Sequence, residues 1–225
     1  MREKKVLLFD LDGTLVDSVP DLADSLNEML LSLGYPTYSQ EEIRSWVGNG
    51  ATVLVRRGLG GGEIDMTIEQ GVLKEALELF LKFYKKNLCV KSKLYPNVKE
   101  TLLLLKQKGF LLALVTNKPE EFISPLLKEL GIYNLFKIYV GADTLERKKP
   151  DPMPLLYVSE QLDYSIQKCV MIGDSKNDIL AAKACEMDSI GVNYGYNYDE
   201  HIQSYAPTHV IENFDQLITL LGVDS

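Results

Sequence analysis

Short apolar runs alternate with helical patterns along most of the chain. The runs are brief and rich in β-branched residues, which is typical of buried strands, and they cover residues 6–9, 111–115, 138–140, 169–172 and 189–192. The helical patterns between them cover residues 98–108, 119–130, 152–161 and 176–186, and a closing helix is predicted over 214–221. Because parallel strands are joined through crossover helices, this alternation predicts an α/β fold with a doubly wound parallel sheet.

The stretch from residue 19 to about residue 90 breaks that alternation. It has helical patterns over residues 21–33, 40–47, 51–57 and 67–87, with a glycine-rich break at 58–62 and no strand pattern. We therefore expect a small α-helical domain inserted after the first strand. The predicted division is an α/β core of residues 1–16 and 92–225 and a helical insertion of residues 17–91.

The composition fits a globular protein and narrows its partners. Of 225 residues, 46% are hydrophobic and 25% are charged, which excludes a disordered or low-complexity chain. The 24 Lys and Arg against 32 Asp and Glu give a net charge of -8. Such a chain is a poor binder of nucleic acid or of an anionic membrane, so we expect neither as a partner. An anionic substrate then needs a metal ion or a few placed cations.

Cysteine usage and hydropathy predict a soluble protein of the cytoplasm. The cysteines, at positions 89, 169 and 185, are far apart and form no Cys/His cluster, which argues against a disulfide framework or a structural zinc site. The first apolar run is too short for a signal peptide, and no stretch reaches the roughly 18 apolar residues of a membrane span. A cytoplasmic location and a monomer or homodimer are the expectation.

Polar residues follow the predicted strands at the ends where ligands bind in open α/β sheets. Asp10, Asp12 and Thr14 follow the first strand. Thr116, Asn117 and Lys118 follow the second, and the third leads to Lys148 and Lys149 before a proline. Gly173, Asp174, Ser175 and Asp178 follow the fourth. One edge of the sheet is therefore expected to gather carboxylates, a hydroxyl and an ammonium group.

This set of groups has a definite chemistry. Several carboxylates in one crevice suit a hard cation such as Mg²⁺, and the bound cation lets a phosphate approach them. One carboxylate then attacks phosphorus and a second serves as general acid and base. A hydroxyl and an ammonium hold the phosphoryl oxygens.

Four of these segments together resemble the motifs of the haloacid dehalogenase superfamily of phosphatases. The segment that resembles the first motif is Asp10-Leu11-Asp12-Gly13-Thr14-Leu15-Val16-Asp17-Ser18. The second motif resembles Thr116-Asn117 and the third Lys149-Pro150. The segment that resembles the fourth is Gly173-Asp174-Ser175-x-x-Asp178. They occur in the family's order between residues 10 and 178. The helical insertion resembles the family's small α-helical cap, and the resemblance implies a Rossmann-like core beneath it.

The resemblance also implies roles for single residues. Asp10 is the expected nucleophile and Asp12 the general acid and base. The phosphoryl group is expected to bind Thr116, Asn117 and Lys149. Mg²⁺ is expected on the Asp10 carboxylate, the Asp12 backbone carbonyl and the Asp174 carboxylate, while Asp178 either touches the metal through water or fixes Lys149. Dehalogenases of the superfamily lack a carboxylate at the position of Asp12, so the sequence favours a phosphatase.

Two further segments narrow the resemblance to phosphoglycolate phosphatases. Residues 46–57 are similar to their cap segment and residues 191–197 to their loop after the fifth strand. Within the first, the turn Gly48-Asn49-Gly50 is a candidate substrate contact, because its backbone N–H groups stand at the start of the next helix and suit a carboxylate. A small phosphorylated metabolite, most simply 2-phosphoglycolate, is the predicted substrate.

Two alternatives remain open on the sequence. Sugar-phosphate phosphatases, pyrophosphatases and β-phosphoglucomutase-like mutases share all four motifs and differ mainly in the cap. Receiver-type signalling modules also bring Asp, Thr and Lys to Mg²⁺ at strand ends. However, their acidic pair is adjacent in sequence and lies on a different strand from the phosphorylated Asp, whereas Asp10 and Asp12 are separated by one residue.

Overall fold

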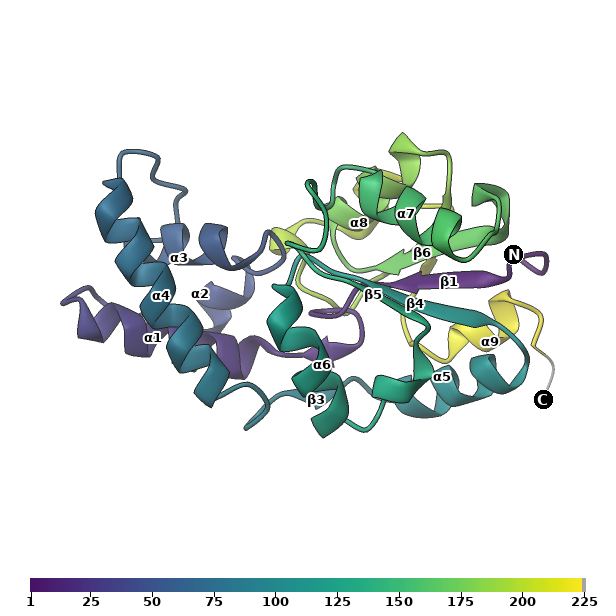
Figure 1. The fold of residues 1–225 in the computed structure, drawn as a ribbon, viewed down its shortest axis with the longest axis horizontal. Coiled ribbons are helices and arrows are strands. Elements are labelled where there is room, and N and C mark those ends of the chain that lie inside the picture. Colours follow the sequence, from purple (N-terminus) through teal and green to yellow (C-terminus); the bar gives the residue numbers. More distant parts are fainter. Residues whose placement is uncertain (224–225) are drawn as a thin grey trace.

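The computed structural model describes residues 1–198 and 200–223. Its centre is a parallel six-stranded sheet in the order β5-β4-β1-β6-β7-β8, with helices on both faces (Figure 1). The strands are β1 (Val6–Phe9), β4 (Leu111–Val115), β5 (Ile138–Val140), β6 (Cys169–Gly173), β7 (Asp188–Val192) and β8 (His209–Ile211). This arrangement confirms the predicted α/β class with a doubly wound sheet.

The sheet is covered on both faces because alternate residues of each strand point to opposite sides. The layer with α5 (Val98–Gln107), α6 (Glu120–Glu129) and α9 (Gln216–Leu220) packs against Leu7 and Phe9. The opposite layer, α7 (Met153–Gln161) and α8 (Lys176–Ala184), packs against Val6 and Leu8. A strand buried on both faces reads as a continuous apolar run, which is why the pattern revealed these strands so directly.

The helical insertion has its own apolar core beside the sheet (Figure 1). It contains α1 (Val19–Ser32), α2 (Gln40–Arg44), α3 (Ala51–Leu59) and α4 (Gln70–Lys86). We call this group of helices the cap. Two short strands, β2 (Val16–Asp17) and β3 (Lys93–Leu94), pair antiparallel where the chain leaves and re-enters the core. The boundaries expected near residues 17 and 91 fall at this ribbon, and the division into domains itself stays a prediction.

The observed ends of two cap helices differ from the predicted ones. The first cap helix begins at Val19 instead of residue 21, because Pro20 in its first turn has the backbone angle that a helix start requires. The second cap helix ends at Arg44 instead of residue 47. Strand β8 was not predicted, since its three residues carry too short a pattern to stand out. Among the described residues, no helix is both long and apolar enough to span a membrane.

Candidate active site

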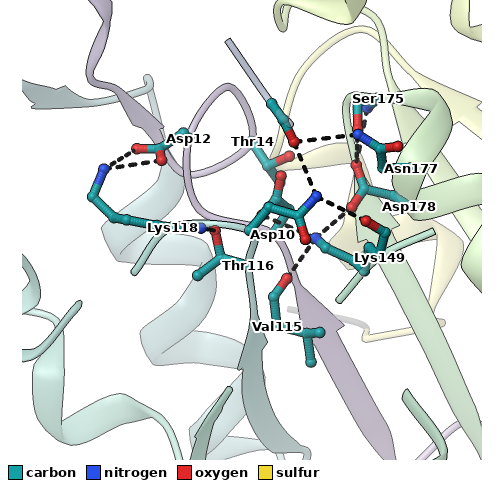
Figure 2. Close-up of polar contacts among 12 residues, drawn as sticks. Asp10, Asp12, Thr14, Val115, Thr116, Lys118, Lys149, Ser175, Asn177 and Asp178 are labelled. Atoms are coloured by element: carbon teal, nitrogen blue, oxygen red, sulfur yellow. Dashed lines mark hydrogen bonds and ion pairs between the residues drawn. The ribbon is translucent and has the colours of Figure 1, made fainter. Parts of the chain in front are cut away.

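The predicted site residues meet at the carboxyl edge of the sheet. Asp10 follows β1, Thr116 follows β4 and Asp174 follows β6, while Lys149 comes from the loop after β5. Because β1 lies between β4 and β6, Asp10 stands between the other strand ends. Strands far apart in the sequence thus deliver one compact polar cluster (Figure 2).

Three buried carboxylates form the centre of this cluster. One oxygen from each of Asp10, Asp174 and Asp178 lies within 4.8 Å of the others. Burial raises the pKa of Asp10 to about 6, with repulsion from Asp178 and Asp12 adding to it and attraction to Lys149 opposing it. Burial, followed by repulsion from Asp10 and Asp178, holds the pKa of Asp174 well above its ordinary value. The cluster therefore carries negative charge that the protein neutralises only in part.

Lys149 supplies the positive charge closest to Asp10. Its Nζ lies 3.0 Å from Oδ1 of Asp10 and 2.5 Å from Oδ1 of Asp178, and it donates to the Val115 carbonyl at 2.6 Å (Figure 2). Burial alone lowers the pKa of Lys149, but attraction to Asp10 and Asp178 outweighs it and the net pKa is raised. Lys149 is therefore a fixed ammonium beside the carboxylate of Asp10.

Asp178 holds Lys149 in place. Its other oxygen, Oδ2, accepts from the Ser175 backbone N–H at 3.0 Å and from the Ser175 hydroxyl at 2.8 Å, which caps helix α8. Of the two expected roles for Asp178, the contact that the structure contains is the one with Lys149.

The carboxylate cluster fits a Mg²⁺ ion by its donor chemistry. Oxygen ligands are what this hard cation prefers, and three carboxylates here face a single ammonium, that of Lys149. Asp174 is oriented by the Thr14 hydroxyl and the Tyr196 N–H, each at 2.8 Å. Gly13, with φ +90°, lets the loop after β1 pass Asp174, since a Cβ there would lie 2.2 Å from its Oδ2. The loop that carries Asp12 therefore passes close to Asp174.

Asp12 points its side chain away from this cluster and toward the cap (Figure 2). Nζ of Lys118 lies 2.9 Å from both of its carboxylate oxygens, and the Ser18 hydroxyl donates to Oδ1 at 2.6 Å. Attraction to Asp12 outweighs burial and raises the pKa of Lys118 above its ordinary value. The two expected catalytic carboxylates thus have different surroundings: Asp10 belongs to the acidic cluster, and Asp12 is paired with Lys118.

Thr116 and Asn117 occupy the edge between core and cap. The Thr116 hydroxyl accepts from the Lys118 N–H at 3.2 Å. The Asn117 side-chain amide donates to the carbonyls of Lys149 and Gly48, each at 3.0 Å. It therefore links the cap to the core loop that carries Lys149. Its own Oδ1 is buried without a hydrogen bond. Phosphate binding by these two residues stays a prediction.

The cap turn of residues 48–50 presents carbonyl groups to donors of the core. The Gly48 carbonyl accepts from Asn117 and from Asn177, the latter at 3.2 Å. Asn49 uses its carbonyl for Lys148, at 2.8 Å, and its side-chain oxygen for Asn177, at 3.0 Å. Gly48 has φ +118°, which favours glycine. In this conformation the turn fastens the cap to the core, and its expected contact with substrate stays a prediction.

A cavity of about 40 Å³ separates the two sides. Its polar end is formed by Asp10, Asp12, Thr116, Asn117 and Lys118. The apolar end comes largely from the cap, through Leu22, Val47, Leu54, Phe80, Leu81 and Tyr84, with Gly48 and Gly50 at the boundary. The space suffices for a few waters or a short organic group.

Sequence reasoning assigned no role to two residues of this cavity, Lys118 and Tyr84. Lys118 stands directly after Thr116-Asn117, where its position at a strand end was a usable signal. Tyr84 lies in the apolar stripe of α4, where an aromatic residue reads as core. Nothing in the local sequence distinguishes it from its neighbour Phe80.

Comparison with known proteins places the chain among enzymes of one type. The family description "Haloacid dehalogenase-like hydrolase" matches residues 7–192. The chain is 53% identical over 222 residues to phosphoglycolate phosphatase of Colwellia psychrerythraea, covering 98% of each chain. It is 44% identical over 226 residues to phosphoglycolate phosphatase of Vibrio cholerae, covering all of both chains.

A solved structure gives the same result at the level of the fold. The crystal structure from Haemophilus somnus 129pt, described as a predicted phosphoglycolate phosphatase, superposes with a TM-score of 0.92 at 38% identity. The match covers 98% of this chain and 99% of the other. Cap and core are both included in that coverage.

Proposed function

This chain belongs to the haloacid dehalogenase-like hydrolases, and we propose that, as a phosphatase of that family, it hydrolyses 2-phosphoglycolate with the help of Mg²⁺ through an aspartyl-phosphate intermediate. The observation that carries the proposal is the placement of Asp10. Its buried Oδ1 lies 3.0 Å from the fixed Lys149 ammonium, inside a carboxylate cluster. That is the setting in which a carboxylate can act as a nucleophile toward phosphorus.

In the first step, an oxygen of Asp10 forms a bond to phosphorus and the bond from phosphorus to the leaving oxygen breaks. Lys149 and the Thr116 hydroxyl are placed to bind the phosphoryl oxygens. Asp12 donates a proton to the leaving oxygen, so that glycolate departs as an alcohol. Bound by Asp10, Asp174 and the Asp12 carbonyl, Mg²⁺ supplies the positive charge that lets a phosphate dianion approach the carboxylates.

In the second step, water attacks phosphorus and the bond between phosphorus and Asp10 breaks. Asp12, now ionised, takes a proton from that water, and inorganic phosphate leaves with Asp10 restored. One carboxylate thus bonds to phosphorus while the other moves a proton twice. The separate surroundings of Asp10 and Asp12 support this division of work.

The cavity supports a small leaving group. Its free volume of about 40 Å³ and its apolar cap side suit a short leaving group such as glycolate, which has one methylene and a carboxylate. Relatives at 53% and 44% identity carry the name phosphoglycolate phosphatase, which favours glycolate as that group.

A substrate panel tests the proposal. Phosphate release is measured with 2-phosphoglycolate, glucose 6-phosphate, a nucleoside monophosphate and pyrophosphate, each with Mg²⁺ and with excess chelator. We expect kcat/KM for 2-phosphoglycolate to exceed the others by about 100-fold or more, and to vanish with the chelator. A larger kcat/KM for glucose 6-phosphate or pyrophosphate, or full turnover in chelator, contradicts it.

A further inference from the structure

Lys118 is the one positively charged side chain among the described residues that line the cavity between core and cap. It follows β4 directly, and only 2% of its side chain is exposed. Lys149, by contrast, lies beneath the carboxylate cluster and does not line this cavity. A buried ammonium is costly unless anions match it, so the partners of Lys118 decide its role.

The partners of Lys118 leave it ready to accept a second carboxylate. Its Nζ spans both oxygens of Asp12 at 2.9 Å and lies 4.8 Å from the centre of the Tyr84 ring. Of these two, only Asp12 is a carboxylate, and it is the one acidic side chain that contacts this ammonium among the described residues.

The Tyr84 hydroxyl is a second polar group at the same place. It is buried beside the Lys118 ammonium and contacts no acceptor among the described residues, and its ring is fixed between Phe80, stacked at 5.8 Å, and Phe122, edge-on at 5.0 Å. Buried hydroxyl groups normally have a partner, because an unpaired one costs free energy. Tyr84 comes from the cap helix α4 and reaches the cavity beside Lys118. An anion placed there satisfies both groups.

We propose that Lys118, together with the Tyr84 hydroxyl, binds the carboxylate of the leaving group and so determines specificity for an acidic substrate. This inference rests on the proposed function, whose substrate class it explains. The ester oxygen must lie within hydrogen-bonding distance of Asp12, and in 2-phosphoglycolate the carboxylate is only two bonds further. Since Nζ of Lys118 already touches Asp12, it is within reach of that carboxylate.

Substrate binding then exchanges one carboxylate for another on the same ammonium. Lys118 keeps an anionic partner throughout, so the buried charge is never left alone. Asp12 is released from its two-oxygen contact only when a leaving group brings a carboxylate of its own. An uncharged leaving group of the same shape leaves Asp12 held, and it is discriminated against even though it fits.

The test compares two substrates that differ in that carboxylate alone. Isobutyl phosphate carries two methyl groups in place of the two carboxylate oxygens of 2-phosphoglycolate. In Lys118→Met we expect kcat/KM for 2-phosphoglycolate to fall by about 100-fold or more beyond its fall for isobutyl phosphate. The matched control is Lys148→Met, which removes a cation from the same cap boundary but outside this cavity, and should change both substrates alike.

A second variant keeps the inference testable if Lys118→Met folds poorly. Tyr84→Phe removes only the hydroxyl and keeps the packed ring, so the protein without substrate should keep a melting temperature close to that of the wild type. At the same time, KM for 2-phosphoglycolate should rise about 5- to 10-fold, with KM for isobutyl phosphate unchanged. A purely structural tyrosine would not separate the two substrates.

The outcomes distinguish this inference from the proposed function. If the wild-type enzyme prefers 2-phosphoglycolate but Lys118→Met and Tyr84→Phe lose activity equally on both substrates, the carboxylate binds elsewhere and the inference fails. If the wild-type enzyme shows no preference for 2-phosphoglycolate, the proposed function fails first. A selective loss in both variants supports the two together.

Discussion

The two walls of the active-site cavity are built on different principles. Behind the core wall, buried carboxylates have fixed polar partners: Asp174 accepts from Thr14 and Tyr196, and Asp178 accepts from Ser175 and Lys149. The cap wall is mostly apolar, and at its boundary with the core the carbonyls of Gly48 and Asn49 accept from core side chains. The core wall is therefore charged and held by hydrogen bonds, whereas the cap wall is apolar and sets the shape of the cavity.

That difference separates chemistry from selection. In the proposed mechanism the core wall contacts a metal ion and the phosphoryl group, and every phosphomonoester has that phosphoryl group. The cap wall and the boundary residue Lys118 are the proposed contacts of the group attached to the phosphate. Changes to the core wall should therefore affect all substrates, while changes at the cap should affect them unequally or mildly.

The largest effect is expected at the core wall, from Asp10→Asn. A neutral amide cannot attack phosphorus, so kcat should fall by more than about 10⁴-fold on every substrate, with the fold retained by circular dichroism. Steady-state phosphate release measures the loss. Near wild-type turnover by this variant would identify another nucleophile.

Asp12→Ala should produce a smaller and substrate-dependent defect. The backbone carbonyl remains for the metal, but the proton for the leaving oxygen is lost, which is typically worth about 10²–10⁴-fold. An aryl phosphate has a good leaving group and should lose less in the first step. Rapid-quench measurement of phosphoenzyme formation checks this, and an equal loss for both substrate types would count against Asp12 as the acid.

Without a metal ion, the carboxylates of the core wall should make the free energy of unfolding depend on pH. With its pKa raised to about 6, Asp10 holds a proton in the folded state that the unfolded chain releases near pH 4. The contribution of Asp10 to stability therefore falls as pH rises from about 4 to about 6, by about 2–3 kcal/mol, and that contribution is constant at higher pH. Asp10→Asn should make this decline shallower.

Thermal melts in chelator check that expectation. Near pH 7.5, Asp10→Asn should melt about 4–8 °C above the wild type, and added Mg²⁺ should raise the wild-type melting temperature more than that of the variant. A variant that melts below the wild type at every pH would show that ionised Asp10 does not destabilise the folded protein.

The smallest effect is expected from the cap turn, in Asn49→Ala. The variant loses one hydrogen bond to Asn177, worth about 1 kcal/mol, so KM should rise no more than about 5-fold on charged and uncharged substrates alike. Recognition of the carboxylate by the turn itself predicts instead a rise confined to 2-phosphoglycolate. Comparing KM for 2-phosphoglycolate and isobutyl phosphate decides between the turn and Lys118.

The same contrast explains how much the sequence could predict. Core strands buried on both faces are continuous apolar runs, so β1, β4 and β5 were predicted to the residue. Once the strand ends are known, the polar residues that follow them, such as Asp10 and Thr116, are placed at the carboxyl edge of the sheet. Glycines also follow two of the core helices: Gly109 and Gly131 stand after α5 and α6 with φ of +86° and +67°, which is typical of a helix end.

The cap side could not be predicted in the same way, because its contacts join residues that are distant in sequence. Tyr84 meets Lys118 across 34 positions, and no local pattern announces that an aromatic residue of an amphipathic helix will reach the site. The direction of the carbonyls in the 48–50 turn likewise depends on donors at 117, 148 and 177. Tertiary packing fixes these features.

The most direct test of the account is to trap the phosphorylated enzyme. Wild-type protein mixed with 2-phosphoglycolate and Mg²⁺ is quenched in acid within one turnover, digested and examined by mass spectrometry. The account predicts one phosphate on the peptide that contains Asp10, sensitive to hydroxylamine and missing from Asp10→Asn. Phosphate found on another residue, or a full burst of glycolate release with no phosphorylated peptide, would contradict it.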